Sequence, residues 1–249
     1  MDDKKAYFIS DIHLGAGWVA DPRAHELAIS RWISSLAGKA SALYILGDAI
    51  DYWYEYRTVV PRGFVRFFAA IASLTDAGIP VYWLKGNHDI WIFDYLPTEI
   101  GVKVIDGALD TVILGHRFYL EHGDLSGEPR RSYRRMQRIF RNRTAQRLFS
   151  AIHPRWTVGF AHRWSSHSRL NGKEASETLQ ADDPLLRFAE QYRKEHPDTE
   201  YFVFGHRHVL VEKTLGPDCH LVILGEGFRL MTYGVFDGES FNIHKIKQY

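Results

Sequence analysis

Five short apolar runs, each ending at a group of polar side chains, constrain the fold of this chain more than any other feature. The runs are 6–10, 42–47, 81–86, 117–123 and 201–205, and segments with helical periodicity occupy 22–37, 62–77 and 183–195. Continuous apolar runs of this length are typical of strands buried on both faces. Alternating strands and helices predict an α/β fold made of β-α-β units around a central sheet. We expect residues 221–249 to add further strands, paired antiparallel.

The polar groups supply seven side chains of the types that bind metal ions. They are Asp11, His13, Asp48, Asn87, His122, His206 and His208. Because ligands bind outside the carboxyl ends of the strands in open α/β sheets, we expect these side chains to meet at one edge of one sheet. Carboxylate and amide oxygens mixed with imidazole nitrogens suit Mn²⁺, Fe or Zn²⁺ better than Ca²⁺. Seven ligands are too many for one ion with an open position, so the sequence predicts two divalent ions, with Mn²⁺ our first choice, that share a bridging carboxylate.

Each of these motifs has an ordinary structural explanation when it is taken alone. An Asp can cap a helix, a His is often structural, and the segment 87–89 could simply form a turn. All five motifs, in order and each at the end of a strand, are explained far better by a metal site than by coincidence. We expect Asp51, Asp89 and Asp124 to orient histidines or turn amides from behind, with an ordinary turn or cap role as the equal alternative.

Composition narrows the class of protein. Hydrophobic residues make up 45% and charged residues 24% of the 249 residues, which predicts one globular domain, 1–249, with an ample core. The net charge of +1 carries no overall signature of polyanion binding. Cys219 is the single cysteine, which excludes an internal disulfide and fits a reducing compartment. Without a signal-peptide pattern or a membrane-spanning apolar run, we expect a cytoplasmic protein.

One segment differs from the rest in its charge. Residues 129–173 contain eleven Arg and one Lys but no Asp or Glu, with apolar residues interleaved at near-helical spacing. We expect an inserted helical cap at about 126–178. The cap could be a pair of solvated helices with a small core of their own. A basic stretch without acidic partners repels itself, however, so it favours a patch for phosphate groups, an anionic bilayer surface or a nucleic acid.

The motifs DIH (11–13), GD (47–48), GNHD (86–89), HGD (122–124) and GHRH (205–208) resemble those of the calcineurin-like metallophosphoesterases in order and spacing. The resemblance implies a sandwich of mixed β-sheets flanked by helices, and hydrolysis of a phosphoester or phosphoanhydride. It implies that one ion is held by Asp11, His13 and His208, and the other by Asn87, His122 and His206. Asp48 would bridge the two ions. His88 would be the catalytic residue, stabilising charge on the phosphoryl group or protonating the leaving oxygen.

A closer resemblance covers most of the chain. The stretches ALYILGDAIDYW (42–53) and SRLNGKEA (168–175), the position of Tyr133 and the long insertion resemble the UDP-2,3-diacylglucosamine pyrophosphatases of lipid A synthesis. The resemblance implies that the chain hydrolyses the pyrophosphate of UDP-2,3-diacylglucosamine to UMP and 2,3-diacylglucosamine 1-phosphate, with a cap that holds the lipid. The residues that it places near the substrate are Asn87, His88, Tyr133, Ser168, Arg169, Lys173 and His206.

These resemblances also imply partners and a location. We expect a lipid-linked UDP-sugar substrate and an anionic membrane surface as partners rather than nucleic acid, at the inner face of the inner membrane. The alternative is another dinuclear-metal phosphodiesterase or phosphatase, such as a nuclease. A non-catalytic scaffold on the same fold is a third reading, against which the complete ligand set argues. The sequence leaves the oligomeric state open.

Overall fold

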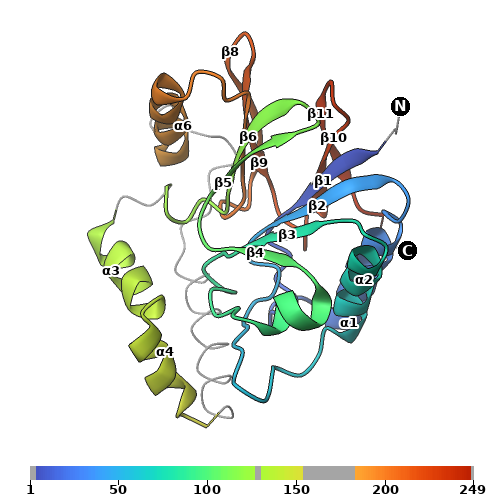
Figure 1. Cartoon of the computed structure of the whole chain (residues 1–249), viewed down its shortest axis with the longest axis vertical. Helices are drawn as coiled ribbons and strands as arrows, with labels where there is room; N and C mark the ends of the chain where they lie inside the picture. The colour runs from blue at the N-terminus through green and yellow to red at the C-terminus, as the bar shows by residue number, and fades with distance from the viewer. Residues whose placement is uncertain (1–3, 127–129, 154–182, 248–249) are drawn as a thin grey trace.

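The structure, a computed structural model, describes residues 4–126, 130–153 and 183–247, and consists of two mixed β-sheets flanked by helices (Figure 1). The first sheet has the order β11 (Phe241–Lys245), β10 (Thr232–Phe236), β1 (Lys5–Ile9), β2 (Ala40–Leu46), β3 (Val81–Leu84) and β4 (Lys103–Ile105). The second has the order β5 (Leu109–Ile113), β6 (His116–Glu121), β7 (Tyr201–Phe204), β9 (Cys219–Leu224) and β8 (Leu210–Gly216). The helical elements are α1 (Pro22–Ser34), α2 (Val65–Asp76), a π-helical turn (Leu96–Ile100), α3 (Arg131–Phe140), α4 (Arg143–Ser150) and α6 (Pro184–Glu195).

The division into two sheets corrects the expectation of one sheet edge. β1, β2 and β3 run parallel in the first sheet, whereas β6 and β7 run parallel in the second. An apolar run shows that both faces of a strand are covered, but not whether a helix or another sheet covers them. The carboxyl ends of both sets of strands nevertheless come together, so the five polar groups still meet.

The C-terminal strands only partly follow the expectation of antiparallel pairing. β10 and β11 are antiparallel, as expected, but β9 runs parallel to β7. The chain leaves β7 and forms the outermost strand, β8, before it turns back. The hairpin then inserts β9 between β8 and β7, which makes β9 parallel to the strand that precedes them both.

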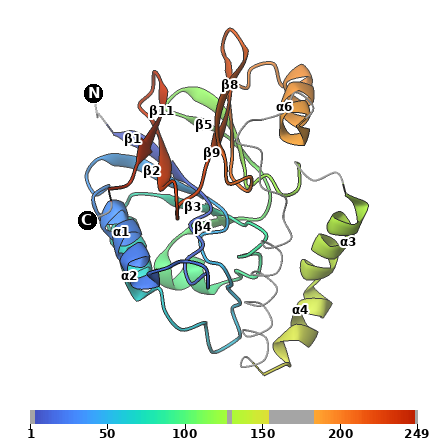
Figure 2. The same ribbon diagram turned by 180° about the vertical axis from the view of Figure 1, so that it is seen from behind.

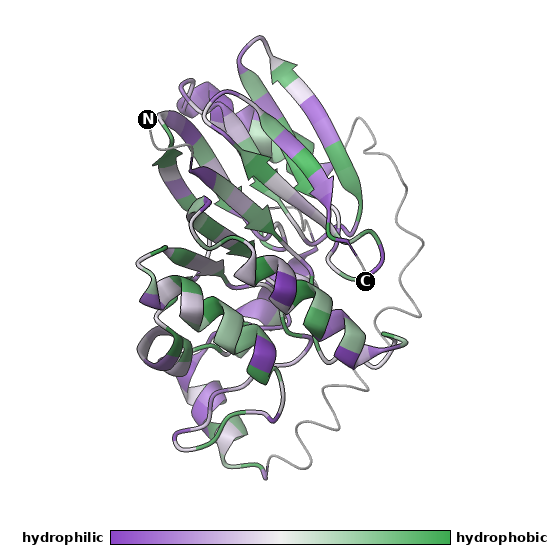
Figure 3. Cartoon of the chain, turned by 90° about the vertical axis from the view of Figure 1, so that its right-hand side faces the viewer, coloured by the Kyte–Doolittle hydropathy of each residue, from purple (hydrophilic) through white to green (hydrophobic). Residues whose placement is uncertain are grey.

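Two of the three predicted helices, α1 and α6, begin at an Asp side chain that caps the first turn. The carboxylate of Asp21 accepts the backbone N–H of Ala24 at 2.9 Å at the start of α1, and Pro22 opens the helix. Asp183 caps α6 in the same way through the N–H of Leu185, at 2.9 Å. The three expected helices are therefore confirmed, with ends shifted by at most three residues. In Figure 3, α1 and α2 face the viewer, and both carry hydrophilic (purple) and hydrophobic (green) residues.

The elements stack in layers around three apolar clusters (Figures 1 and 2). α1 and α2 cover one face of the first sheet, whose other face packs on the second sheet, and α6 covers the outer face of the second sheet. Alternating side chains serve the two faces, so Ile9 packs toward α1 and α2 while Phe8 packs between the sheets. Both sheets are therefore held by burial on both faces.

A column of stacked rings joins the two sheets inside the central layer. Neighbouring ring centroids are 4.6 to 5.8 Å apart and the ring planes are inclined by 24° or less. The column consists of His220, Tyr201, Phe118, Phe8, Tyr44 and Tyr82, one from each of six strands. Stacked aromatic rings stabilise a structure beyond the apolar area that they bury, and they prefer specific geometries. The column therefore favours one packing arrangement of the two sheets.

Helices α3 and α4 begin the segment expected to form the cap, and they lie apart from both sheets on the left of Figure 1. Two hydrogen bonds attach them to the sheet layers: Trp91 Nε1 donates to Phe140 O at 3.0 Å, and the Tyr54 hydroxyl donates to Gln146 O at 2.7 Å. The ring of Phe149 stacks on Trp91 with centroids 5.0 Å apart. Residues 127–129 and 154–178 of this segment lie outside the described residues. Among those described, no helix is long and apolar enough to span a bilayer.

Candidate metal centre

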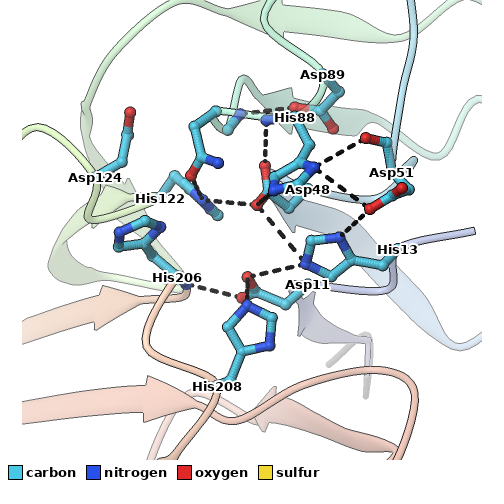
Figure 4. A network of polar contacts seen from close by, with 12 residues as sticks. Asp11, His13, Asp48, Asp51, His88, Asp89, His122, Asp124, His206 and His208 are labelled. Carbon is cyan, nitrogen blue, oxygen red and sulfur yellow. Dashed lines mark hydrogen bonds and ion pairs between the residues drawn. The ribbon is translucent and has the colours of Figure 1, made fainter. Parts of the chain in front are cut away.

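Five loops, one after each of β1, β2, β3, β6 and β7, converge at the carboxyl ends of their strands (Figure 4). Backbone hydrogen bonds hold the loops together: Asp11 N donates to Gly47 O at 3.1 Å, and His13 N donates to Asp48 O at 2.9 Å. Gly205 N likewise donates to the carbonyl of His122, at 3.0 Å. Segments nearly 200 residues apart in sequence thereby form one rim. All seven predicted ligands lie on this rim.

Asp11, His13 and His208 form the first group of candidate ligands. Asp11 Oδ1 lies 3.4 Å from His208 Nε2 and 3.8 Å from His13 Nε2. The other oxygen, Oδ2, accepts the Ser10 hydroxyl at 2.6 Å and the His206 N–H at 2.8 Å. Within the described part of the chain, the buried Oδ1 accepts no hydrogen bond. A buried carboxylate oxygen that faces two imidazole nitrogens is satisfied by a cation, so this group fits a divalent metal.

Asp48, His122 and His206 form the second group, and Asn87 Oδ1 lies 3.3 Å from His122 Nε2. Asp48 Oδ2 lies between the two groups, 3.4 Å from His122 Nε2 and 3.7 Å from His13 Nε2. The His122 ring is oriented from behind, because its Nδ1 lies 2.7 Å from the carbonyl oxygen of Leu46. Asp48 is thus placed where a bridging carboxylate would have to be.

The charges at the rim are strongly coupled. Burial raises the pKa of the Asp48 carboxyl, but nearby His122 and His88 outweigh burial and lower it well below its ordinary value. The pKa of His122 is raised, because Asp48 and Asp11 overcome the effect of its burial. The pKa of His206 falls to about 3 through burial and the neighbouring His122. The metal-free rim therefore holds anionic oxygens, a neutral imidazole at His206 and a protonated one at His122, so metal binding would release a proton from His122.

Five of the seven candidate ligands have a left-handed backbone. Their φ angles lie between 50° and 67°, at Asp11, His13, Asp48, His206 and His208. L residues rarely adopt this conformation, which costs roughly 1–3 kcal/mol per residue and persists only where the surrounding structure enforces it. The strained backbone at these turns directs carboxylates and imidazoles from several loops toward the common rim.

Two glycines of the motifs are required by close approach. A Cβ atom at Gly86 would lie 2.1 Å from Asp48 Oδ1, and one at Gly205 would lie 1.9 Å from Ser10 Oγ. Any larger residue at either position would displace a neighbouring candidate ligand or the hydroxyl that holds it. The glycines in GNHD and GHRH therefore serve to let the loops pack against one another.

His88 lies beside the two groups, with its side chain 19% exposed. Its Nδ1 donates to the backbone carbonyl of Asp51 at 2.9 Å. Asp51 Oδ1 lies 3.4 Å from His88 Nδ1 and 3.3 Å from His13 Nδ1. Burial lowers the pKa of His88, but the charges of Asp48 and Asp51 outweigh it and raise the value to about 9. His13, Asp51 and His88 are also close enough to hold a cation, although the Nδ1–H of His88 is already donated to Asp51.

Asp89 and Asp124, which were expected to orient histidines or turn amides, have different surroundings. Asp89 holds the turns together, since it accepts the N–H groups of Gly86 at 2.7 Å and Ala49 at 3.0 Å and the indole N–H of Trp83 at 3.0 Å. Asp124 faces α3, where Gln137 Nε2 donates to it at 3.2 Å and Gln137 also bonds the Tyr133 hydroxyl at 2.8 Å. The structure thus brings Tyr133 next to the loop of His122. Ser168, Arg169 and Lys173 lie outside the described residues.

The structure adds a sixth loop that the sequence motifs did not include. The turn after β9 carries Glu226, which is fully buried, and Phe228, whose ring meets His13 edge-on at 5.8 Å. The ring of Trp18 also lies 5.8 Å from His13. A Glu directly after the apolar run 221–225 was the available signal, because β9 ends at the same edge as β7.

A two-sheet sandwich with carboxylates and imidazoles at one rim defines a class, the metal-dependent phosphoesterases. Residues 4–210 match the family model described as calcineurin-like phosphoesterase. The chain belongs to the calcineurin-like phosphoesterase family, and it is a metal-dependent hydrolase. The resemblance inferred from the motifs and the expected α/β sandwich are thus confirmed.

Within this class, several relatives of this chain share a single name. A protein of Porphyromonas gingivalis named UDP-2,3-diacylglucosamine hydrolase is 39% identical over 98% of this chain and 98% of its own length. A protein of the same name from Neisseria meningitidis serogroup A is 29% identical and covers 82% of both chains. The crystal structure of a dimetal phosphatase from Danio rerio has a TM-score of 0.50 and 14% identity, covering 99% of this chain and 100% of that one, which shows the shared fold.

Proposed function

We propose that this protein hydrolyses the pyrophosphate of UDP-2,3-diacylglucosamine to UMP and 2,3-diacylglucosamine 1-phosphate. The observation that carries the proposal is the 39% identity to a UDP-2,3-diacylglucosamine hydrolase over 98% of both chains. That alignment includes the basic segment between β6 and α6 as well as the metal-binding motifs. The likeness thus extends to the part of the chain that would distinguish this substrate from other phosphoesters.

Two divalent ions, with Mn²⁺ as the expected metal, are held at the rim. Asp11, His13 and His208 would hold one ion, Asn87, His122 and His206 would hold the other, and Asp48 would be shared between them. The unsatisfied Asp11 Oδ1 and the position of Asp48 Oδ2 between His13 and His122 support this assignment. When bound, the ions supply Lewis-acid charge and lower the pKa of a water molecule.

His88 is the catalytic residue that acts on the phosphoryl group. Its ring is partly exposed and Asp51 holds Nδ1 from behind, so Nε2 points away from Asp51 and lies 4.0 Å from Asp48 Oδ2, beside the proposed ions. In the metal-free protein the charges of Asp48 and Asp51 raise the pKa of His88 to about 9, and Asp51 would still favour the protonated ring once metal ions hold Asp48. A cation stabilises negative charge on phosphoryl oxygens and can protonate the leaving oxygen. Asn87 and His206 border the same space.

Residues 126–178 form the cap that receives the acyl chains. In its described part, α3 borders an open cavity of about 430 Å³ lined by Arg131, Ser132, Arg135, Met136, Ile139 and Phe140. Apolar walls with arginines at the edge suit a ligand that has acyl chains and phosphates. Tyr133 contacts the substrate from α3, and Ser168, Arg169 and Lys173 do so from the second half of the segment.

The substrate is a lipid, so the enzyme works at a membrane surface. We place it in the cytoplasm, peripherally bound to the inner face of the inner membrane. Ile139 is 52% and Leu148 is 70% exposed on the cap helices, among arginines that have no acidic residue between positions 130 and 153. Exposed apolar side chains beside arginines favour contact with an anionic bilayer.

The test is release of UMP by the purified protein with Mn²⁺ from UDP-2,3-diacylglucosamine in detergent micelles, followed by chromatography. UDP-N-acetylglucosamine, which lacks the acyl chains, and a single-stranded oligonucleotide are the comparison substrates. We expect UMP from the acylated substrate only. Cleavage of the oligonucleotide without release of UMP would instead assign a nuclease activity and overturn the proposal.

A further inference from the structure

Glu226 is a fully buried acid in the turn after β9, and its two oxygens have different surroundings. Oε1 accepts the backbone N–H of Leu230 at 2.9 Å, the backbone N–H of Arg229 at 3.2 Å and Nε of Arg229 at 3.3 Å. Oε2 accepts no hydrogen bond from any residue that the structure describes. One oxygen therefore holds the turn in shape, and the turn does not account for the other.

Oε2 faces a candidate metal ligand. It lies 3.9 Å from Nδ1 of His208, whose Nε2 lies 3.4 Å from Asp11 Oδ1 on the opposite side of the ring. The imidazole thus stands between two carboxylates, one on the metal side and one behind. A histidine that binds a metal through one nitrogen presents its other N–H to an acceptor, and the acceptor fixes the ring and raises its basicity.

The neighbouring imidazoles also have an acceptor behind them, at hydrogen-bond distance rather than at the 3.9 Å of Glu226. Nδ1 of His122 lies 2.7 Å from the Leu46 carbonyl, and Nδ1 of His13 lies 3.3 Å from Asp51 Oδ1. These acceptors belong to the end of β2 and to the loop that follows it. Glu226 supplies the equivalent group for His208 from a part of the chain outside all five motifs.

The turn that carries Glu226 is attached to the first group of ligands. Gly227 N donates to Asp11 O at 2.9 Å, and Nε2 of His25 contacts Gly227 O at 2.8 Å. A Cβ at Gly227 would lie 3.0 Å from Ile12 Cα, so the turn packs directly on the loop of Asp11. The ring of Phe228 covers His208, with centroids 5.6 Å apart. These contacts hold Glu226 in register with His208.

We infer that Glu226 is a positioning residue that acts through His208 and strengthens metal binding at the position formed by Asp11, His13 and His208. The inference rests on the proposed assignment of the metal ligands. It does not depend on the identity of the substrate, because metal binding is measured without it.

The test is Mn²⁺ binding to metal-free Glu226→Gln, measured by titration calorimetry and by elemental analysis after dialysis at fixed Mn²⁺. The Gln amide oxygen can still accept from Leu230 and Arg229, while its NH₂ group faces His208 in place of the acceptor. We expect the affinity for one of the two ions to fall about 10- to 100-fold and the other to be unchanged. In a His208→Ala background the same substitution should have no further effect on metal affinity.

Glu55→Gln is the matched control. Glu55 is also a buried acid that organises a turn, accepting from Tyr95 N and Trp53 Nε1 at 3.1 Å, and it contacts no candidate ligand in the described structure. The substitution Glu55→Gln should lower the melting temperature of the metal-free protein without changing its affinity for Mn²⁺. Wild-type binding of both ions by Glu226→Gln would overturn the inference, as would an equal loss at both positions that Glu55→Gln reproduces. Wild-type UMP release is scored separately, so either proposal can fail alone.

Discussion

The backbone N–H of His88 donates a hydrogen bond to Asp48 Oδ1 at 2.8 Å. This bond occupies one oxygen of the carboxylate and turns the other, Oδ2, toward the imidazoles of His13 and His122. The turn that carries the proposed catalytic imidazole therefore also sets the orientation of the proposed bridging ligand. Displacement of either residue should disturb the other.

Asp48→Asn tests the bridging ligand. The Asn side chain can still accept from His88 N, but it removes the charge shared by the two groups of ligands. We expect UMP release to fall below detection and at least one of two Mn²⁺ ions to be lost, measured by elemental analysis of the dialysed protein. Asp76→Asn, an exposed acid at the end of α2, is the control and should behave as wild type. Full metal content in Asp48→Asn would contradict the bridging role.

His88→Ala separates catalysis from metal binding. Since His88 is proposed to act on the phosphoryl group and not to bind a metal, its removal should lower turnover by roughly 10²–10⁴. Metal content and the melting temperature with Mn²⁺ should stay near wild type. Turnover and metal content are measured on the same preparation. A variant that keeps near-normal turnover would remove His88 from the mechanism.

Tyr54→Phe tests whether the cap must be anchored. The substitution deletes the hydroxyl that donates to Gln146 O and keeps the ring that packs on Phe149. Loss of about 0.5–1.5 kcal/mol of attachment should lower kcat/KM for the acylated substrate by up to roughly tenfold. Hydrolysis of bis-p-nitrophenyl phosphate, which has no acyl chain, should not change. Tyr82→Phe, a matched loss of a hydroxyl at a strand far from the cap, should leave both activities intact; equal losses in the two variants would argue against the anchor.

His25 predicts a pH dependence of stability. Burial lowers the pKa of His25 in the folded protein, although its ring contacts the carbonyl of Gly227. The unfolded chain binds this proton near pH 6.5, so below that pH it carries more protons at this site than the folded chain does. The free energy of unfolding therefore falls as the pH is lowered through about 6.5, because protonation of His25 then favours the unfolded chain.

We expect the wild type to lose part of its advantage over His25→Gln as the pH falls from 7.5 to 5.5. Urea unfolding of both metal-free proteins measures the difference in free energy of unfolding. Titration of the metal ligands is common to both chains and cancels in that difference. A difference that stays constant across this range would show that His25 does not titrate between the two states.

Much of the layered fold could be predicted because apolar periodicity and helix caps are local properties. The expected strands 6–10 and 201–205 are found as β1 and β7, which are buried on both faces, and Asp21 and Asp183 cap helices at the expected places. The division into two sheets could not be predicted, because an apolar face on Phe8 does not show whether it meets a helix or the ring of Phe118.

The residues of the candidate site could be predicted from the sequence where they lie in short motifs directly after strands. The seven predicted ligands meet because the carboxyl ends of the parallel strands of both sheets come together. Glu226 was missed because it belongs to no motif, and its significance comes only from Oε2 facing His208 across the fold. Tyr54 and Trp91 were missed as cap anchors because an aromatic residue near a motif is usually a core residue. Their other role is shown only by two hydrogen bonds, from Tyr54 to Gln146 and from Trp91 to Phe140.

The left-handed turns at the rim have an evolutionary consequence. Glycine would occupy such conformations at less cost than Asp or His, so a descendant that no longer had to hydrolyse its substrate would gain stability by exchanging them. Such a lineage would drift toward a plain scaffold and would leave glycines where the acids and imidazoles once stood. A homologue with glycines at these positions would be expected to lack hydrolase activity, and its sequence alone would identify it.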